Sequence, residues 1–215
     1  MSALRQPTKA TSVRQSALEN LREALLAGQF PPGHALTEAA LSSQMRISRG
    51  PVREALLVLE QEGLVDHHPN HGFTVVNWDH DAGAEMAVVR LPLEIIALEL
   101  ACKSVNENRL RELDEIKRRI LNGVRARDAA VWIREDLRFH EKIWEWSGNM
   151  WLMMALRRIT YPFFVFTLVH QERRTPPTPD TMEQLHNAFV DYLRGNRERT
   201  AEECVRLHLD RYSVV

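Results

Sequence analysis

Apolar residues in the first third of the chain recur every three or four positions in three separate runs. This spacing predicts amphipathic helices over residues 14–28, 36–45 and 49–63. Residues 46–48 are expected to form a tight turn between the second and third helices. Two short β-prone runs around a polar, histidine-rich turn follow within residues 64–76. The order helix, helix, turn, helix, hairpin is typical of a winged helix-turn-helix, in which the last helix meets DNA.

Capping residues and an apolar face support these helices. Thr37 has the side chain of an N-cap for the second helix, Ser48 can cap the third, and Gly63 can end it. The third helix places four apolar side chains on one inner face: Val52, Ala55, Leu56 and Leu59. We therefore expect this helix to pack through one side and to present its other side outward.

The remainder of the chain has only helical spacing. Six helices are expected, separated by glycine, asparagine and proline residues, over 81–105, 107–126, 128–147, 149–170, 180–194 and 197–212. A change in composition after residue 77 marks a domain boundary. The prediction is a mostly α protein with a flexible arm at 1–12, a winged helix-turn-helix domain at 13–77 and an all-helical bundle at 78–215.

Charge placement, rather than total charge, favours DNA as the partner of the first domain. The chain has a net charge of -1, and residues 1–77 contain seven Lys/Arg and seven Asp/Glu. Arg49 and Arg53 lie one helical turn apart on one face of the third helix, where they can contact base edges or phosphates. The candidate DNA contacts also include the turn and the hairpin, and are Arg46, Ser48, Arg49, Arg53, Asn70, His71 and Gly72.

Four residues of the expected bundle suggest a metal site. Asp136 and His140 are four positions apart, so they share one face of a helix. His186 and His208 are 22 positions apart, and their midpoint, residue 197, lies beside a Gly-Asn turn. Residues equidistant from the turn of an antiparallel helix pair stand at the same height, so these two histidines can converge. One carboxylate and three imidazoles suit Zn, Ni, Mn or Fe(II) better than Ca or Mg.

Each of these residues also has an ordinary structural explanation. An Asp/His pair at this spacing is often a surface contact, and a histidine among apolar neighbours is ordinarily a hydrogen-bonded core residue. Arg90 lies in an apolar stretch and either forms a salt bridge with Glu94 or clamps the carboxylate of a ligand. Cys204 either neighbours the metal or is a small buried group. Four tryptophans are expected in the core or in dimer contacts rather than in a ligand cage: Trp132, Trp144, Trp146 and Trp151.

Composition indicates a cytoplasmic location. The chain is 44% hydrophobic and 27% charged, which is ordinary for a soluble globular protein. Its two cysteines, Cys102 and Cys204, have no disulfide-type spacing, which favours a reducing compartment. No segment approaches the roughly 20 apolar residues of a membrane span, and the polar N-terminus lacks the apolar core of a signal peptide. We therefore expect no membrane partner.

The N-terminal motif resembles that of the GntR family of bacterial transcription regulators. The resemblance covers residues 14–77 and rests on PPGHALTEAALSSQMRISRGPVREALLVLEQEGLV followed by PNHGFTV. The run SRGPVREAL, from Ser48 to Leu56, is similar to the recognition-helix signature of the family. Family members commonly have Thr in place of Gly50 and Arg in place of His71.

The second domain resembles the FadR C-terminal type, abbreviated FCD, in its metal-binding subgroup. The similar stretches are VVRLPLE, EDLRFHEKIWEWSGN, MEQLHNAFVDYLRGN and AEECVRLHL. In that subgroup one Asp and three His bind a divalent metal, and a small organic acid binds beside it. The resemblance maps these ligands onto Asp136, His140, His186 and His208, with Zn or Ni ahead of Mn or Fe.

These observations predict a ligand-responsive transcription regulator. A homodimer would bind an inverted-repeat DNA operator, and a small carboxylate effector at the metal would change the affinity for DNA. Arg90 would pair with the effector, and Asn149 would help to close the pocket. Two alternatives stay open: a metal-dependent enzyme that uses the Asp/His₃ site, and a bundle that serves only for dimerisation.

Overall fold

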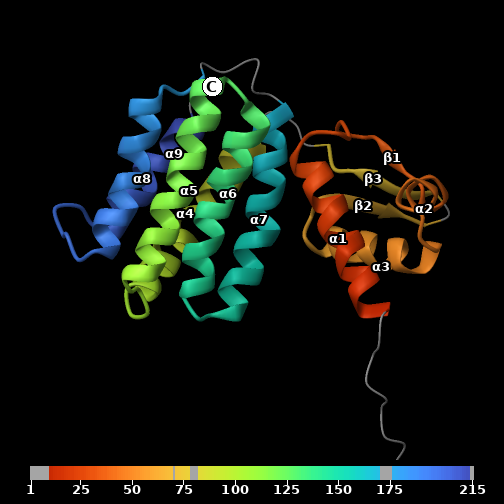
Figure 1. Cartoon of the computed structure of the whole chain (residues 1–215), viewed down its shortest axis with the longest axis horizontal. Coiled ribbons are helices and arrows are strands. Elements are labelled where there is room, and N and C mark those ends of the chain that lie inside the picture. Colours follow the sequence, from red (N-terminus) through yellow and green to blue (C-terminus); the bar gives the residue numbers. More distant parts are fainter. Residues whose placement is uncertain (1–9, 70, 78–81, 170–175, 214–215) are drawn as a thin grey trace, which may run out of the picture. The chain divides into compact units, whose positions relative to one another are not determined.

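The computed structural model describes residues 10–69, 71–77, 82–169 and 176–213. The chain forms two compact units, Met1–Asn77 and Trp78–Val215. The first carries a small antiparallel sheet and three helices, and the described part of the second is entirely helical, so the prediction of a mostly α protein with a winged helix-turn-helix and a helical bundle is confirmed (Figure 1).

The first unit is built around its third helix. Its elements are α1 (Ala10–Leu26), β1 (Ala35–Leu36), α2 (Glu38–Met45), α3 (Arg49–Gln61), β2 (Val65–His68) and β3 (Gly72–Val75). Helix α3 contacts α1, α2 and β2, while the strands form an antiparallel sheet in the order β1-β3-β2 (Figure 1). The four predicted inner residues of α3 are each 0% exposed: Val52, Ala55, Leu56 and Leu59. Burial of this apolar face fixes α3 against its neighbours.

The turn between α2 and α3 has a strained backbone. Thr37 caps α2 as predicted, accepting a hydrogen bond from the Ala40 amide at 3.3 Å. Arg46 then ends α2 in the left-handed region, with φ 54°. Few residues other than glycine adopt that conformation. Ser48 holds the N-cap position of α3 but its side chain makes no capping hydrogen bond, so the predicted capping by its hydroxyl is wrong.

Two boundaries of the first unit differ from the sequence prediction. Helix α1 begins at Ala10, inside the expected arm, because no glycine or proline interrupts the chain between Pro7 and Gly28. Residues 1–9 lie outside the described part. The short strand β1 was not predicted, since two residues carry too little alternation to detect. Its Leu36 pairs with Phe73 of β3 and closes the sheet over the core.

The second unit is a bundle of six helices within the described residues. They are α4 (Ala82–Ala101), α5 (Glu107–Ala126), α6 (Ala129–Trp146), α7 (Met150–Val169), α8 (Pro179–Leu193) and α9 (Ala201–Ser213). Helix α4 packs against α6, α7, α8 and α9, so it runs through the middle of the bundle, and α5 covers α6 and α8 (Figure 1). In the described residues, no helix is both long and apolar enough to cross a membrane.

The last helix starts four residues later than expected. Thr200 and Glu203 form a reciprocal capping box: the Glu203 carboxylate accepts from the Thr200 amide at 2.7 Å, and the Thr200 hydroxyl accepts from the Glu203 amide at 3.1 Å. This Thr-x-x-Glu signature places the start of α9 at Ala201, whereas the prediction took the Gly195-Asn196 turn as the boundary.

Gly123 permits a close contact between α5 and α6. It lies inside α5, facing the first turn of α6, where an added Cβ would stand 2.8 Å from the backbone nitrogen of Trp132 and 3.0 Å from a side-chain carbon of Val131. The backbone of α6 cannot move aside in the way that the end of a long, flexible side chain can. The glycine therefore sets the distance between α5 and α6, and α6 carries the residues of greatest chemical interest.

We predict that Gly123→Ala destabilises the bundle by about 1–3 kcal/mol, because the new methyl group overpacks the helix contact. Helix propensity alone predicts the opposite sign, a gain of about 1 kcal/mol. Gly50→Ala in α3 is the matched control, since nothing lies within 4 Å of an added Cβ there. Denaturant unfolding of the full chain measures both. A Gly123→Ala protein as stable as wild type would show that α5 and α6 can separate without cost.

Candidate metal centre and nucleic-acid interface

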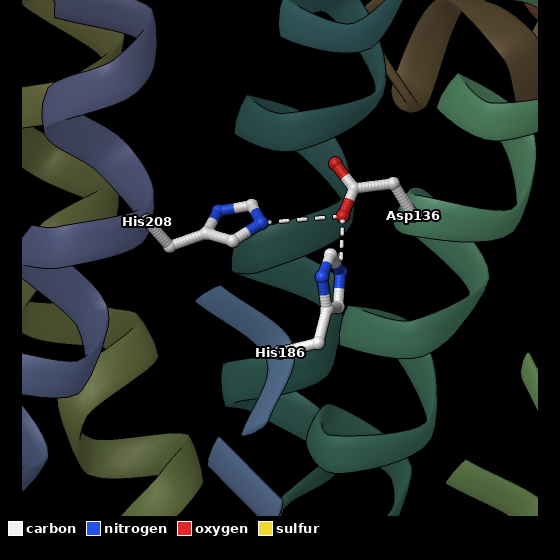
Figure 2. Close-up of side chains that lie close together, drawn as sticks. All are labelled: Asp136, His186 and His208. Atoms are coloured by element: carbon white, nitrogen blue, oxygen red, sulfur yellow. Dashed lines mark hydrogen bonds and ion pairs between the residues drawn. The ribbon is translucent and has the colours of Figure 1, made fainter. Parts of the chain in front are cut away.

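Three helices bring three of the four predicted ligands to one point inside the bundle. Asp136 comes from α6, His186 from α8 and His208 from α9, and each offers a ligand atom within 4.8 Å of the others. The Asp136 Oδ1 atom lies 2.8 Å from His186 Nε2 and 3.2 Å from His208 Nε2. Figure 2 shows both imidazoles turned toward this carboxylate. The predicted convergence of the two histidines across the α8–α9 turn is thus found in the structure.

His140 supplies the fourth side chain. Its Nε2 atom lies 3.3 Å from His208 Nε2 and 3.9 Å from Asp136 Oδ1, one turn along α6 from that carboxylate. All four side chains are at most 1% exposed. Neither the surface-contact explanation of the Asp/His pair nor four unrelated core residues describes this arrangement.

The outer ring nitrogens of His186 and His140 lie beside oxygen atoms of neighbouring groups, and their Nε2 atoms face the Asp136 carboxylate. His186 donates from Nδ1 to the carbonyl oxygen of Met182 at 2.7 Å, so its Nε2 is the unprotonated atom in the neutral ring. His140 Nδ1 lies 3.4 Å from Glu94 Oε2 on α4. Ring nitrogens held in this way by a carbonyl or carboxylate are characteristic of histidines that bind metals.

The Asp136 carboxylate and the three imidazoles are better suited to binding a cation than to hydrogen bonding with one another. With Nδ1 donating to Met182, His186 must carry a second proton to donate from Nε2 to the Asp136 carboxylate. Two Nε2 atoms, on His140 and His208, also face each other at 3.3 Å, where only one can donate. A divalent ion among these atoms would let every one of them act as an electron-pair donor.

Burial keeps the imidazole of His208 neutral. Loss of solvent lowers the pKa of His208 to about 3, although the adjacent Asp136 carboxylate acts to raise it. For Asp136 burial acts to raise the pKa, but His208 and His186 outweigh burial and hold the pKa well below its usual value. An ionised carboxylate beside a neutral imidazole is the protonation state that metal ligation requires.

Glu94 links this cluster to a buried arginine. Its Oε1 atom accepts from Arg90 Nε at 2.9 Å, and its Oε2 atom accepts from the Trp144 indole at 2.8 Å. Burial acts to raise the pKa of the Glu94 carboxyl, but His140 and Arg90 together lower it to about 2. The charge on Glu94 therefore persists inside the bundle, balanced by Arg90. Sequence reasoning identified the pair with Arg90 but missed the bonds to α6, which no spacing along the chain reveals.

The structure places Arg90 in the salt bridge that was one of its two predicted roles. The side chain is 0% exposed, and its guanidinium carbon lies 5.2 Å from the centre of the Phe163 ring and 5.4 Å from that of Phe164. Its Nη2 atom lies 2.9 Å from Glu94 Oε1, while its Nη1 atom has no hydrogen-bond partner among the described residues. Asn149 is not brought to the cluster: it is exposed, and its side chain caps α7 by accepting from the Leu152 amide at 3.1 Å.

Other candidate residues of the bundle have structural roles. Cys204 is buried and its thiol donates to the Ala188 carbonyl at 3.3 Å, in accord with a small buried group. Burial raises the pKa of this thiol. Trp132, Trp144 and Trp146 lie in the core, whereas Trp151 on α7 is 74% exposed.

The first unit presents its candidate DNA contacts outward. Four of them are exposed at the start of α3 and in the turn before it: Arg46, Ser48, Arg49 and Arg53. Arg53 keeps 59% of its side-chain surface accessible while its guanidinium lies 3.6 Å from the Glu38 carboxylate on α2. A pair of this length and exposure holds the side chain weakly, so Arg53 can exchange Glu38 for another anion.

The remaining candidate DNA contacts lie in the wing, the hairpin formed by β2 and β3. His71 is exposed, and its amide donates to the His68 carbonyl at 2.9 Å across the turn. Gly72 has φ 84°, a conformation that side chains rarely adopt. Asn70 lies outside the described residues. The wing and the start of α3 thus supply exposed polar groups on a rigid scaffold, which is the arrangement a DNA-binding module needs.

Comparison with protein families identifies both halves of the chain. Residues 13–75 match the family of bacterial regulatory proteins named gntR, and residues 85–211 match the FCD domain. The chain belongs to the GntR family. It is a DNA-binding transcription regulator with a winged helix-turn-helix and an FCD domain, as the sequence predicted.

Individual relatives agree with this assignment. The chain is 31% identical to the HTH-type transcriptional regulator Mce2R of Mycobacterium tuberculosis, with 94% of this chain and 92% of that protein covered. It is 27% identical to the HTH-type transcriptional regulator YdhC of Bacillus subtilis, over 88% of this chain and 84% of the relative. Both relatives are named as transcription regulators, so they give no support to the enzyme alternative.

Solved structures share the fold. Escherichia coli McbR/YncC superposes with a TM-score of 0.79 at 22% identity, covering 92% of this chain and 93% of that one. A putative GntR regulator from Rhodococcus sp. RHA1 gives a TM-score of 0.73 at 20% identity, covering 93% and 94%. At these identities the likeness concerns the fold.

Proposed function

We propose that this protein is a metal-dependent sensor of small organic acids that controls transcription. A divalent ion, Zn or Ni ahead of Mn or Fe, is held by Asp136, His140, His186 and His208. A carboxylate effector binds beside it, and the effector alters the affinity of a homodimer for an inverted-repeat operator. The protein acts in the cytoplasm, where bacterial DNA is found, and has no membrane partner.

The observation that carries the proposal is the buried convergence of Asp136, His140, His186 and His208 from three helices. Burying these groups together is costly unless something binds them. An ion so held would supply a positive charge and an attachment point for a carboxylate oxygen. The domain that contains them is joined to a DNA-binding module, so a sensory role explains both halves of the chain.

Arg90 supports an anionic effector. Of the buried terminal nitrogens of its guanidinium, Nη2 forms an ion pair with Glu94 Oε1 at 2.9 Å, and Nη1 has no hydrogen-bond partner in the described residues. A guanidinium with unused donors suits a carboxylate, which can accept two parallel hydrogen bonds. Arg90 is connected to His140 through Glu94, so an acid could contact the arginine and the metal together.

Exposed apolar side chains support a homodimer. On α4, Val88 is 74%, Val89 51% and Ile96 44% exposed, and α7, which packs against α4, exposes Met150 and Trp151. Large apolar side chains left exposed on two helices that pack together are available for contact with a second copy of the chain. Two copies joined through these faces would carry two α3 helices, and successive major grooves lie about 34–36 Å apart.

We expect Arg53→Ala to weaken binding to a duplex selected from a random pool by the wild-type protein about 10- to 100-fold. The exposed arginine contributes little to folding, so the circular dichroism spectrum and melting temperature should stay unchanged. A fluorescence anisotropy titration at fixed salt measures the affinity. Arg118→Ala, which removes an arginine of the second unit that is 71% exposed, should bind as wild type does. Equal affinity of Arg53→Ala and wild type would contradict the DNA interface.

Full-length protein purified without chelators should contain about one divalent first-row metal ion per chain. The double variant His186→Ala/His208→Ala should lose it, because two of four donors are removed. Elemental analysis by mass spectrometry provides the measurement. The control His34→Ala/His67→Ala also removes two histidines, but from the first unit, and should retain the metal. Metal-free wild type, or equal metal in both double variants, would exclude the centre.

Val88→Glu/Ile96→Glu should convert a dimer into a monomer, because two charges would be buried in an apolar interface. Sedimentation velocity across a concentration series distinguishes the two states. Leu207→Glu on α9, where the leucine is 40% exposed, serves as the control for a charge on an exposed apolar position. If the double variant sediments as wild type does, the α4 face is not part of a dimer interface.

A further inference from the structure

A threonine on α7 has a buried hydroxyl that the structure leaves unused. Thr160 is 0% exposed, and its Oγ1 atom has no hydrogen-bond partner among the described residues. Thr167, on the same helix and 3% exposed, differs: its hydroxyl donates to the Phe163 carbonyl at 2.8 Å. A helical threonine ordinarily satisfies its hydroxyl in this way. The unpaired hydroxyl of Thr160 is a costly group without a folding role.

Thr160 shares a helix face with the residues that surround Arg90. Successive residues of a helix are rotated by about 100°, so Thr160 projects between the directions of Phe163 and Phe164, one turn earlier. Both phenylalanine rings contact the Arg90 guanidinium. On the adjoining face, Arg157 and Tyr161 meet Glu141 of α6. Thr160 is therefore directed toward the side of α7 that borders α4 and α6.

The height of Thr160 along the bundle corresponds to that of Glu94. Helices α4 and α7 run in opposite directions. Arg90, in the first half of α4, is level with Phe163 and Phe164, in the second half of α7. Ser104, just after the end of α4, donates to the Trp146 carbonyl, just before the start of α7. One turn back along α7 thus matches one turn forward along α4, from Arg90 to Glu94. Glu94 contacts His140. The hydroxyl lies at the level between the arginine and the proposed metal ligands.

We infer that Thr160 is a specificity-determining residue of the effector site, and that it selects small hydroxycarboxylates over acids that lack the hydroxyl. This inference rests on the proposed function and names the effector class. The Arg90 nitrogens can only donate, so they suit a carboxylate. A threonine hydroxyl both donates and accepts, so it suits a group with the same property, a hydroxyl on the effector.

The first arm of the test measures stability in the absence of acids. Thr160→Val keeps the side-chain shape and removes only an unsatisfied hydroxyl, so the melting temperature should rise by about 2–4 °C. Thr167→Val removes a satisfied hydroxyl and should lower the melting temperature by a similar amount. A fall in the melting temperature of Thr160→Val would show that its hydroxyl is already bonded, and would overturn the inference.

The second arm measures binding of matched acids to the full-length, metal-containing protein by calorimetry. The probes are citrate against tricarballylate and malate against succinate, pairs that differ by one hydroxyl. Wild type should bind at least one hydroxy acid about tenfold more tightly than its partner. In Thr160→Val this preference should fall to within about twofold, while Thr160→Ser and Thr167→Val should retain it.

The outcomes separate the inference from the function on which it rests. If wild type holds metal and binds acids but Thr160→Val keeps the full preference, the role of Thr160 is wrong and the sensor remains. If wild type binds both acids of each pair equally, the role of Thr160 is also wrong, and the proposed sensor function remains. If wild type holds no metal and binds none of the four acids, both the inference and the proposed function are overturned.

Discussion

Burial of charge in the middle of an α-helical bundle is the constraint on which the second unit depends. Within the described part of the unit, six acidic, basic or histidine side chains are each at most 1% exposed: Arg90, Glu94, Asp136, His140, His186 and His208. Removing such groups from water costs several kcal/mol each unless partners replace the solvent. Four helices share this requirement, because α4, α6, α8 and α9 each contribute at least one member. The helices cannot shift independently without leaving a charge uncompensated.

The sequence predicts this cluster because helical periodicity and turn position are local properties. The spacing of Asp136 and His140 sets a shared face, and the Gly195-Asn196 turn brings His186 and His208 to one height. The shared face follows from the geometry of a single helix, and the common height follows for any antiparallel pair of helices joined by a turn. The contact of Glu94 with His140 and its hydrogen bond from Trp144 could not be predicted in the same way. They depend on how α4 packs against α6, which is decided by side-chain fit between residues about fifty positions apart.

Errors in the predicted fold also arise where local signals compete. The start of α9 is decided by the capping box of Thr200 and Glu203, a stronger signal than the preceding Gly-Asn turn. The strand β1 exists only because β3 offers it a partner, so its cause is tertiary. Ser48 has an N-cap residue type and position but no capping bond, and its hydroxyl is left exposed at the candidate DNA surface. Residue type thus indicates the helix start, while the use of the side chain depends on its surroundings.

Glu94 is the residue through which events at the cluster would reach the rest of the molecule. It contacts His140 on α6, belongs to α4 and balances Arg90, while the opposite side of α4 carries the exposed Val88 and Ile96. A rearrangement at His140 or Arg90 must therefore either move α4 or leave the Glu94 carboxylate poorly paired. Buried pairs strongly resist the second outcome. Any ligand that favours one arrangement over the other would shift α4 by no more than its difference in affinity for the two states allows. A helix that is central to the bundle, charged on its inner side and apolar on its outer side can thus transmit a local change in charge pairing to the exposed apolar face that we propose as the dimer interface.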